Sequence, residues 1–123
     1  MELTQNGDKL IYLQLKEWLE DEILSGTFPE NTQIPSVAEL SVSFKLNHIT
    51  ALKSVNILSD AGILYKKRGI GTFVSEGAAD MIRKQRHSGF YEKYVISMTS
   101  EAKKLGIELD ELKEMIERGY ENE

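Results

Sequence analysis

The chain has 123 residues, of which 41% are hydrophobic and 28% charged, and its formal net charge is −5, so it fits one typical domain or a small domain with an appendage. It contains no cysteine, which excludes disulfides and thiolate metal sites. Residues 1–8 lack the basic and apolar segments of a signal peptide, and no apolar run approaches the roughly 18 residues of a membrane span, so we expect a cytoplasmic protein without a membrane partner.

The first predicted helix covers residues 10–25. Its apolar side chains recur at helical spacing and form one stripe, made of Ile11, Leu15, Leu19 and Ile23. Gly26 ends this helix, and residues 28–31 have the composition of a turn.

A second helix is predicted to start after Pro35. Ser36 is followed three residues later by Glu39, which is the capping-box pattern, in which each side chain satisfies a free backbone N–H. The expected buried face of this helix consists of Val37, Leu40 and Phe44.

A third helix is predicted over about residues 48–60, with Asn47 as its N-cap. At 100° per residue, one face carries Ala51, Ser54, Val55 and Leu58. The opposite face carries Ile49, Lys53 and Asn56, with His48, Thr50 and Leu52 on the flanks. Two short helices joined by a tight turn, the second polar on its outer face, are typical of a helix-turn-helix.

A small β-hairpin is predicted next, with residues 68–74 as its tip and return strand. Gly69 and Gly71 supply the φ freedom of a tight turn, and Thr72 begins a run of strand formers. Three cations stand at the base of the tip, namely Lys66, Lys67 and Arg68. A cationic glycine hairpin directly after a helix-turn-helix indicates a DNA-binding wing, and these local cations outweigh the net charge over a Debye length of roughly 8–10 Å.

After the hairpin the pattern changes to two predicted helices separated by a break at Gly106. A heptad-like apolar stripe runs along them, made of Tyr91, Tyr94 or Val95, Met98, Ala102 and Leu105, then Leu112, Met115, Ile116 and Tyr120. Two helices cannot bury both apolar faces alone, so we expect this region to pair with a second copy of the chain. The predicted division is a DNA-binding domain over 1–75 and a helical dimerisation region over 76–123.

In combination, these motifs resemble the GntR family of bacterial transcription regulators over about residues 10–75. The matching residues are Ile11–Leu15, Ile23–Gly26, Ile34–Ser36, Glu39, Leu40, Thr50, Leu58, Gly62 and Arg68–Val74. The segment 101–107, followed by a short helix, is similar to the YtrA-type subgroup. That resemblance implies a dimerisation tail without a dedicated ligand pocket.

Three positions depart from the pattern of that family. Ala38 and His48 stand where many members carry arginine, and Ile49 stands where asparagine is common. Lys53 corresponds to the basic residue that follows Thr50 in the subgroup. The missing arginines remove side chains that could make bidentate contacts to guanine.

The predicted DNA-binding residues come from the caps, the third helix and the wing: Ser36, Asn47, His48, Ile49, Thr50, Lys53, Lys67, Arg68, Gly69, Gly71 and Thr72. Ile49 is expected to be exposed and to pack on thymine methyl groups. Ser36 is an N-cap, and the helix end that it caps could also receive a phosphate. The predicted dimerisation residues are Tyr91, Tyr94, Val95, Met98, Ala102, Leu105, Leu112 and Ile116.

The sequence therefore predicts a mostly α fold with a small β-hairpin, a winged helix-turn-helix followed by a short two-helix dimerisation region. Its expected function is to bind double-stranded operator DNA of inverted-repeat form as a homodimer, with a repressor favoured. Two histidines without cysteine give no metal-ligand set, and no catalytic arrangement or cofactor site is recognisable, so we expect no enzyme. The alternatives are a winged-helix interaction adaptor and a ligand-sensing regulator with a pocket in the C-terminal helices. Whether a small-molecule effector exists stays open.

Overall fold

The computed structural model describes residues 10–122, so the expectation for the first eight residues falls outside the described part. The chain forms two compact units, one reaching to Lys84 and one beginning at Gln85. The expected domain boundary at residue 75 lies before the helix that spans this junction. Each unit is described by itself below.

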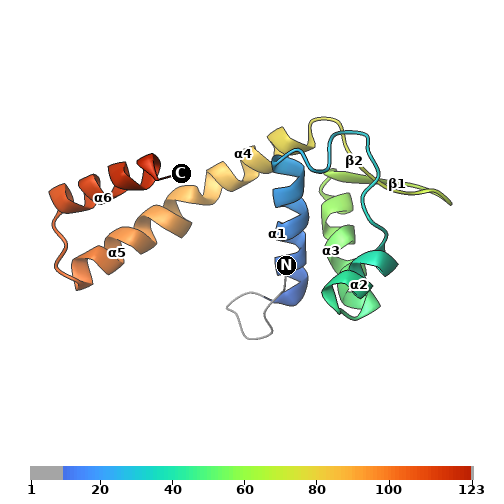
Figure 1. The fold of residues 1–123 in the computed structure, drawn as a ribbon, viewed down its shortest axis with the longest axis horizontal. Coiled ribbons are helices and arrows are strands. Elements are labelled where there is room, and N and C mark those ends of the chain that lie inside the picture. The colour runs from blue at the N-terminus through green and yellow to red at the C-terminus, as the bar shows by residue number, and fades with distance from the viewer. Residues whose placement is uncertain (1–9, 123) are drawn as a thin grey trace. The chain divides into compact units, whose positions relative to one another are not determined.

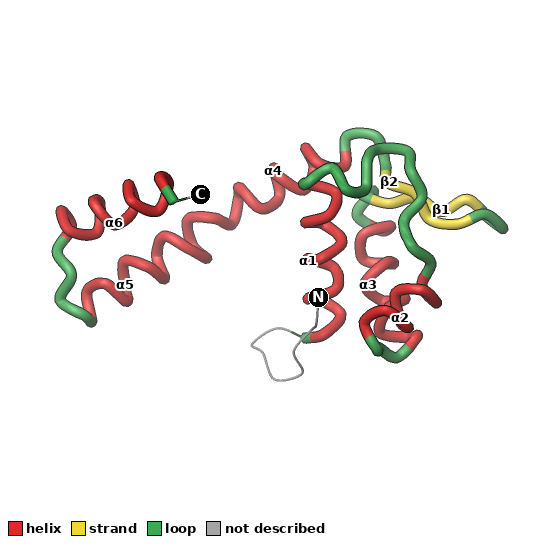
Figure 2. The backbone as a smooth tube through the Cα atoms, viewed as in Figure 1, coloured by secondary structure: helices red, strands yellow, loops and turns green. Residues whose placement is uncertain are grey.

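The first unit contains three helices, a hairpin and the first turns of a fourth helix (Figure 1): α1 Ile11–Leu24, α2 Val37–Phe44, α3 His48–Asp60, β1 Leu64–Lys67, β2 Gly71–Val74 and α4 Ala78–Phe90. Among the described residues, the two strands are those of the hairpin, drawn in yellow in Figure 2. This order is that of a winged helix-turn-helix and confirms the predicted fold class.

The core of this unit lies between α1 and α3, which pack against each other. Leu15 and Leu19 of the α1 stripe are buried, as are Val55 and Leu58 of α3, so the predicted inner faces are confirmed. Ile82 of α4 is buried in the same cluster. The first turns of α4 therefore belong to the winged helix.

The hairpin is antiparallel, with Leu64 opposite Val74 and Lys67 opposite Gly71. Residues 31–34 add a short third partner along β2 through a bridge between Gln33 and Phe73. The Ile34 N–H donates to the Thr72 carbonyl at 2.9 Å. The predicted two-stranded hairpin thus has lateral support that its own sequence did not indicate.

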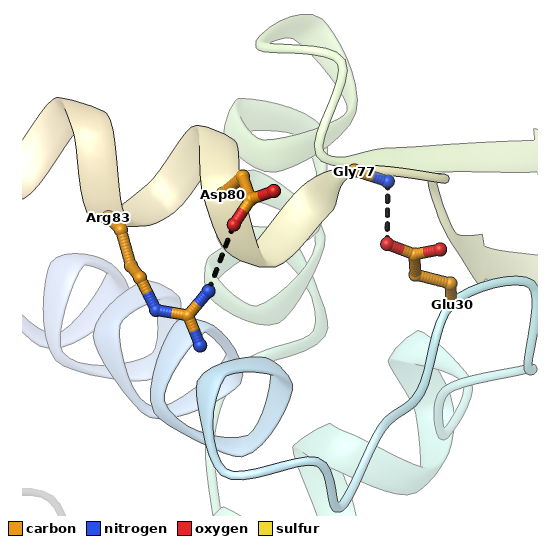
Figure 3. Close-up of polar contacts among 4 residues, drawn as sticks. All are labelled: Glu30, Gly77, Asp80 and Arg83. Atoms are coloured by element: carbon orange, nitrogen blue, oxygen red, sulfur yellow. Dashed lines mark hydrogen bonds and ion pairs between the residues drawn. The ribbon is translucent and has the colours of Figure 1, made fainter.

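The start of α4 is fastened to the loop that follows α1. A Glu30 carboxylate oxygen accepts a hydrogen bond from the Gly77 N–H at 2.8 Å, just before the first residue of the helix (Figure 3). Asp80 and Arg83 form an ion pair on the surface of the same helix at 3.1 Å. A carboxylate beside the amides of a helix N-terminus stabilises it, so Glu30 fixes where α4 begins.

The second unit is helical and its first helix is not uniform. From the end of α4 the chain passes through a π-helical turn, η1 Tyr91–Ile96, into α5 Ser97–Lys104, with right-handed helical backbone at both junctions. Gly106 then adopts a φ of 72°, and α6 Leu109–Glu121 follows. The two predicted helices are present, but the π turn is not visible in the apolar spacing. No helix among residues 10–122 has the length and apolar character to cross a membrane.

The N-terminus of α2 has the predicted capping box. The Ser36 hydroxyl accepts from the Glu39 N–H at 3.0 Å, and the Ser36 N–H donates to a Glu39 carboxylate oxygen at 2.8 Å. The Ser36 backbone N–H and then its hydroxyl hold the pKa of the Glu39 carboxyl below its usual value. Because folding lowers the pKa of Glu39, ionised Glu39 stabilises the folded state at pH values above the usual carboxyl range. This stabilisation is lost as the pH falls through the pKa of the folded state.

We expect Ser36→Ala to lower the free energy of unfolding by about 1 kcal/mol, because one backbone N–H at the start of α2 loses its acceptor. Urea denaturation at neutral pH measures this. Ser43→Ala, at an exposed position of the same helix, is the matched control. Equal midpoints for the two variants would show that the cap contributes no stability.

Candidate nucleic-acid interface

The first turn of α3 presents its polar and apolar side chains to solvent. Asn47 is the N-cap, and its Oδ1 accepts from the Ile49 N–H at 2.8 Å. His48 is exposed, Ile49 is 73% exposed and Thr50 is half-buried. The predicted exposure of Ile49 is confirmed, and an exposed isoleucine at a helix start can contact a flat apolar group on a partner.

Lys53 is exposed, one turn further along α3, and α1 holds its ammonium group in place. Lys53 Nζ lies 4.0 Å from the centroid of the Tyr12 ring, a cation–π distance. The neighbouring buried Ser54 donates from its hydroxyl to the Tyr12 carbonyl at 2.6 Å. Tyr12 therefore fixes both the helix and its cation, a role that the α1 sequence pattern did not reveal.

The wing is connected to α3 by a side-chain hydrogen bond. Lys66 Nζ donates to Asn56 Oδ1, which explains why Asn56 is half-buried although spacing places it on the outer face. An ammonium group has three donors, so Lys66 keeps two that this bond does not use. The bond joins α3 to the wing, the two elements that carry most of the predicted DNA-binding residues.

The tip of the wing is a tight turn with an exposed arginine. The Ile70 N–H donates to the Lys67 carbonyl at 2.9 Å, and Gly69 has a φ of 76°, as the third position of a type II turn requires. Arg68, between Lys67 and Gly69, is exposed. The positive φ at position 69 explains why this residue is glycine.

Lys67 lies over aromatic rings on one side of the wing. Its Nζ is 4.5 Å from the Phe73 ring centroid and 5.9 Å from that of Tyr65, and the two rings stack at 5.6 Å. Thr72, next to Phe73, is half-buried and uses its carbonyl to bind Ile34. The wing thus presents one cation held over rings and one at its tip.

The structure brings the predicted DNA-binding residues to three places in the first unit: the start of α2, the first two turns of α3 and the wing. The side chains among them that carry or can acquire positive charge are His48, Lys53, Lys67 and Arg68, and no acidic residue is a member of the set. Within residues 10–122 no group of histidines and carboxylates could hold a metal ion. The arrangement is suited to an anionic polymer.

The predicted dimerisation residues all lie in the second unit, but their exposure differs. Tyr91 and Tyr94 are 57% and 53% exposed, and Leu105 and Ile116 are exposed as well. Val95 and Met98 are half-buried. Ala102 and Leu112 are already buried, at 5% and 8% exposure, within one copy of the chain. These two residues therefore stabilise the unit itself.

Further apolar side chains of the second unit are exposed beyond those predicted. Phe90 and Ile96 are about half exposed, and the Phe90 ring lies 5.3 Å from that of Tyr94. The heptad pattern did not identify these two residues, because the π-helical turn η1 changes the residue spacing along the helix. These aromatic and aliphatic side chains are therefore not covered within one copy of the chain.

Comparison with known proteins gives a consistent family match. Residues 11–74 match the bacterial regulatory proteins of the gntR family. A chain from Bacteroides thetaiotaomicron assigned to the GntR family is 35% identical, with a TM-score of 0.71 over 91% of this chain and 97% of that one. The DNA-binding domain of AraR in complex with operator ORX1 is 31% identical, with a TM-score of 0.55 over 61% of this chain and 95% of that one.

A curated relative is similar over about half of this chain. The histidine utilization repressor of Klebsiella aerogenes is 35% identical over 65 residues, which are 53% of this chain and 27% of that protein. The curated relatives first matched are likewise covered over 27–31% of their length. The similarity therefore covers less than a third of the length of each of these relatives.

Proposed function

Since the chain belongs to the GntR family of bacterial regulatory proteins, we propose that it is a sequence-specific DNA-binding transcription regulator, acting as a repressor in the bacterial cytoplasm. One observation carries the proposal: the capped start of α3 exposes Ile49, and the wing that follows this helix exposes Arg68 at its tip. A chain that is 31% identical and has the same fold over this unit is described in complex with operator DNA, which supports the proposal.

In this proposal the first turns of α3 enter the major groove. Thr50 and His48 reach base edges, and Lys53, held over Tyr12, binds a phosphate or a guanine edge. The wing enters the adjacent minor groove, where Arg68 meets the negative potential and Gly69 lets the backbone approach. The hydrogen bond between Asn56 and Lys66 holds α3 and the wing in a fixed position relative to each other.

The protein is further proposed to act as a homodimer of the YtrA-type subgroup. The exposed apolar residues of the second unit support dimerisation, because a second copy is the simplest partner for an unpaired helical surface. The similarity over 97% of the Bacteroides thetaiotaomicron chain supports a tail of this short type. A two-fold dimer binds an inverted repeat with half-sites about one helical turn apart. No small-molecule effector forms part of the proposal.

Fluorescence anisotropy tests this function on duplexes from the upstream region of the gene, with a shuffled duplex as control and at two salt concentrations. We expect tight, selective and salt-sensitive binding. Thr50→Ala is expected to weaken it about tenfold, because one base contact contributes about 1–3 kcal/mol. Arg68→Ala is expected to weaken it and to reduce the salt slope by about one for each copy bound.

Equal weak binding to both duplexes, unchanged by either substitution, would overturn the proposal. It would favour the interaction adaptor, with which the net charge of −5 agrees. Selective binding that Thr50→Ala leaves unchanged would contradict the placement of α3 in the major groove.

A further inference from the structure

Gln33, which no sequence motif singled out, lies against the tip of the wing. It belongs to the short stretch that pairs with β2, and its backbone bridges to Phe73. Its side chain extends further toward the tip, where Nε2 donates to the Ile70 carbonyl at 3.1 Å. Gln33 therefore supports the turn itself, beyond the last pair of strand residues, Lys67 and Gly71.

The absence of a side chain at Gly71 leaves the space that the end of the Gln33 side chain occupies. A Cβ atom added at Gly71 would lie 2.2 Å from Gln33 Nε2 and 3.0 Å from its Cδ, well inside contact distance. Gly71 also has a φ of 155°, which side-chain-bearing residues rarely adopt. A side chain at this position would displace the end of the Gln33 side chain, and the backbone conformation itself favours glycine.

Among the residues that the structure describes, the tip has few contacts beyond the turn hydrogen bond from the Ile70 N–H to the Lys67 carbonyl. Residues 68–70 are all exposed, and a hairpin of two four-residue strands is marginal on its own. If Arg68 reaches into a narrow groove, a tip held in place before binding loses less conformational entropy on binding.

We propose that Gln33 is a positioning residue for DNA recognition, which holds the wing tip so that Arg68 enters the minor groove. The inference rests on the proposed function, because it assigns the wing to DNA. Gln33 acts through its hydrogen bond to the Ile70 carbonyl. Its effect on affinity therefore depends on Arg68 being present.

A double-mutant cycle in the full chain tests this dependence. Gln33→Ala is expected to weaken operator binding about fivefold, because the tip loses one neutral hydrogen bond and becomes less ordered before binding. In the Arg68→Ala background the same change should have almost no further effect. Gln85→Ala, the same truncation at an exposed position of α4, is the control.

Amide hydrogen exchange in the free protein gives a reading that does not require DNA. Gln33→Ala should speed exchange at the Ile70 N–H about fivefold and leave amides of α1 unchanged. Unchanged exchange would overturn the inference whether or not the protein binds DNA. If the wild type binds selectively and the effects of Gln33→Ala and Arg68→Ala simply add, the positioning role is wrong while the proposed function stands. If the wild type shows no selectivity, the proposed function fails, and the role in DNA recognition fails with it.

Discussion

Replacing Tyr91 and Tyr94 together with aspartate is expected to convert the proposed dimer to a monomer and to weaken operator binding by about 100-fold or more. Both rings are more than half exposed in one copy, within the exposed aromatic surface that also contains Phe90. Two carboxylates placed in an apolar interface would lose their hydration without gaining partners. A monomer would then bind each half-site separately and lose the gain in affinity from linked binding.

Sedimentation velocity measures the oligomeric state, and anisotropy on a complete and a half operator measures affinity. Ser100→Asp is the control, because it adds charge at an exposed α5 position about half a turn away from Met98 and Ala102. A Tyr91→Asp/Tyr94→Asp variant that remains dimeric would place the interface elsewhere. A monomer that binds the complete operator as tightly as the wild type would show that one copy suffices.

Local signals made much of the first unit predictable. The Ser36–Glu39 box, the Asn47 cap and the Gly69 turn each act within a few residues, so each element is specified where it forms. The inner face of α3 follows from the 100° step in the same way. The exposure of Ile49 follows from it as well.

Contacts between distant residues were not predictable in this way. Ser54 binds the carbonyl of Tyr12, and Gln33 reaches Ile70, although 42 and 37 positions separate the partners. Periodicity reports which face of an element is apolar, but it does not report which polar side chains meet once the elements pack. The details of the candidate site that concern Lys53, Lys66 and Gln33 therefore appear only in the fold.

The second unit shows a different limit. A heptad pattern assumes one spacing along the helix, and η1 interrupts it at Tyr91–Ile96. Ala102 and Leu112 fit the predicted stripe but are buried within one chain, whereas Phe90 and Ile96 lie outside it and are exposed. An apolar stripe marks residues that need burial without distinguishing burial in one copy from burial between two.

Two substitutions in α3 are expected to separate stability from DNA recognition. Leu58→Ala should lower the free energy of unfolding by about 3 kcal/mol, because Leu58 is fully buried in the core and its truncation leaves a cavity. Ile49→Ala, in the exposed first turn of the same helix, should change it by less than about 0.5 kcal/mol. Urea denaturation of both variants measures the difference.

Operator binding should show the reverse order. Ile49→Ala is expected to weaken affinity about fivefold through lost apolar contact, whereas Leu58→Ala should bind normally at a temperature where it remains folded. Duplexes in which deoxyuridine replaces thymidine lack the methyl groups that Ile49 is proposed to contact. The wild type should bind them less tightly than the thymidine duplex, and Ile49→Ala should bind both equally. If Ile49→Ala still distinguishes the two duplexes as the wild type does, another residue reads the methyl groups and the role proposed for Ile49 is wrong.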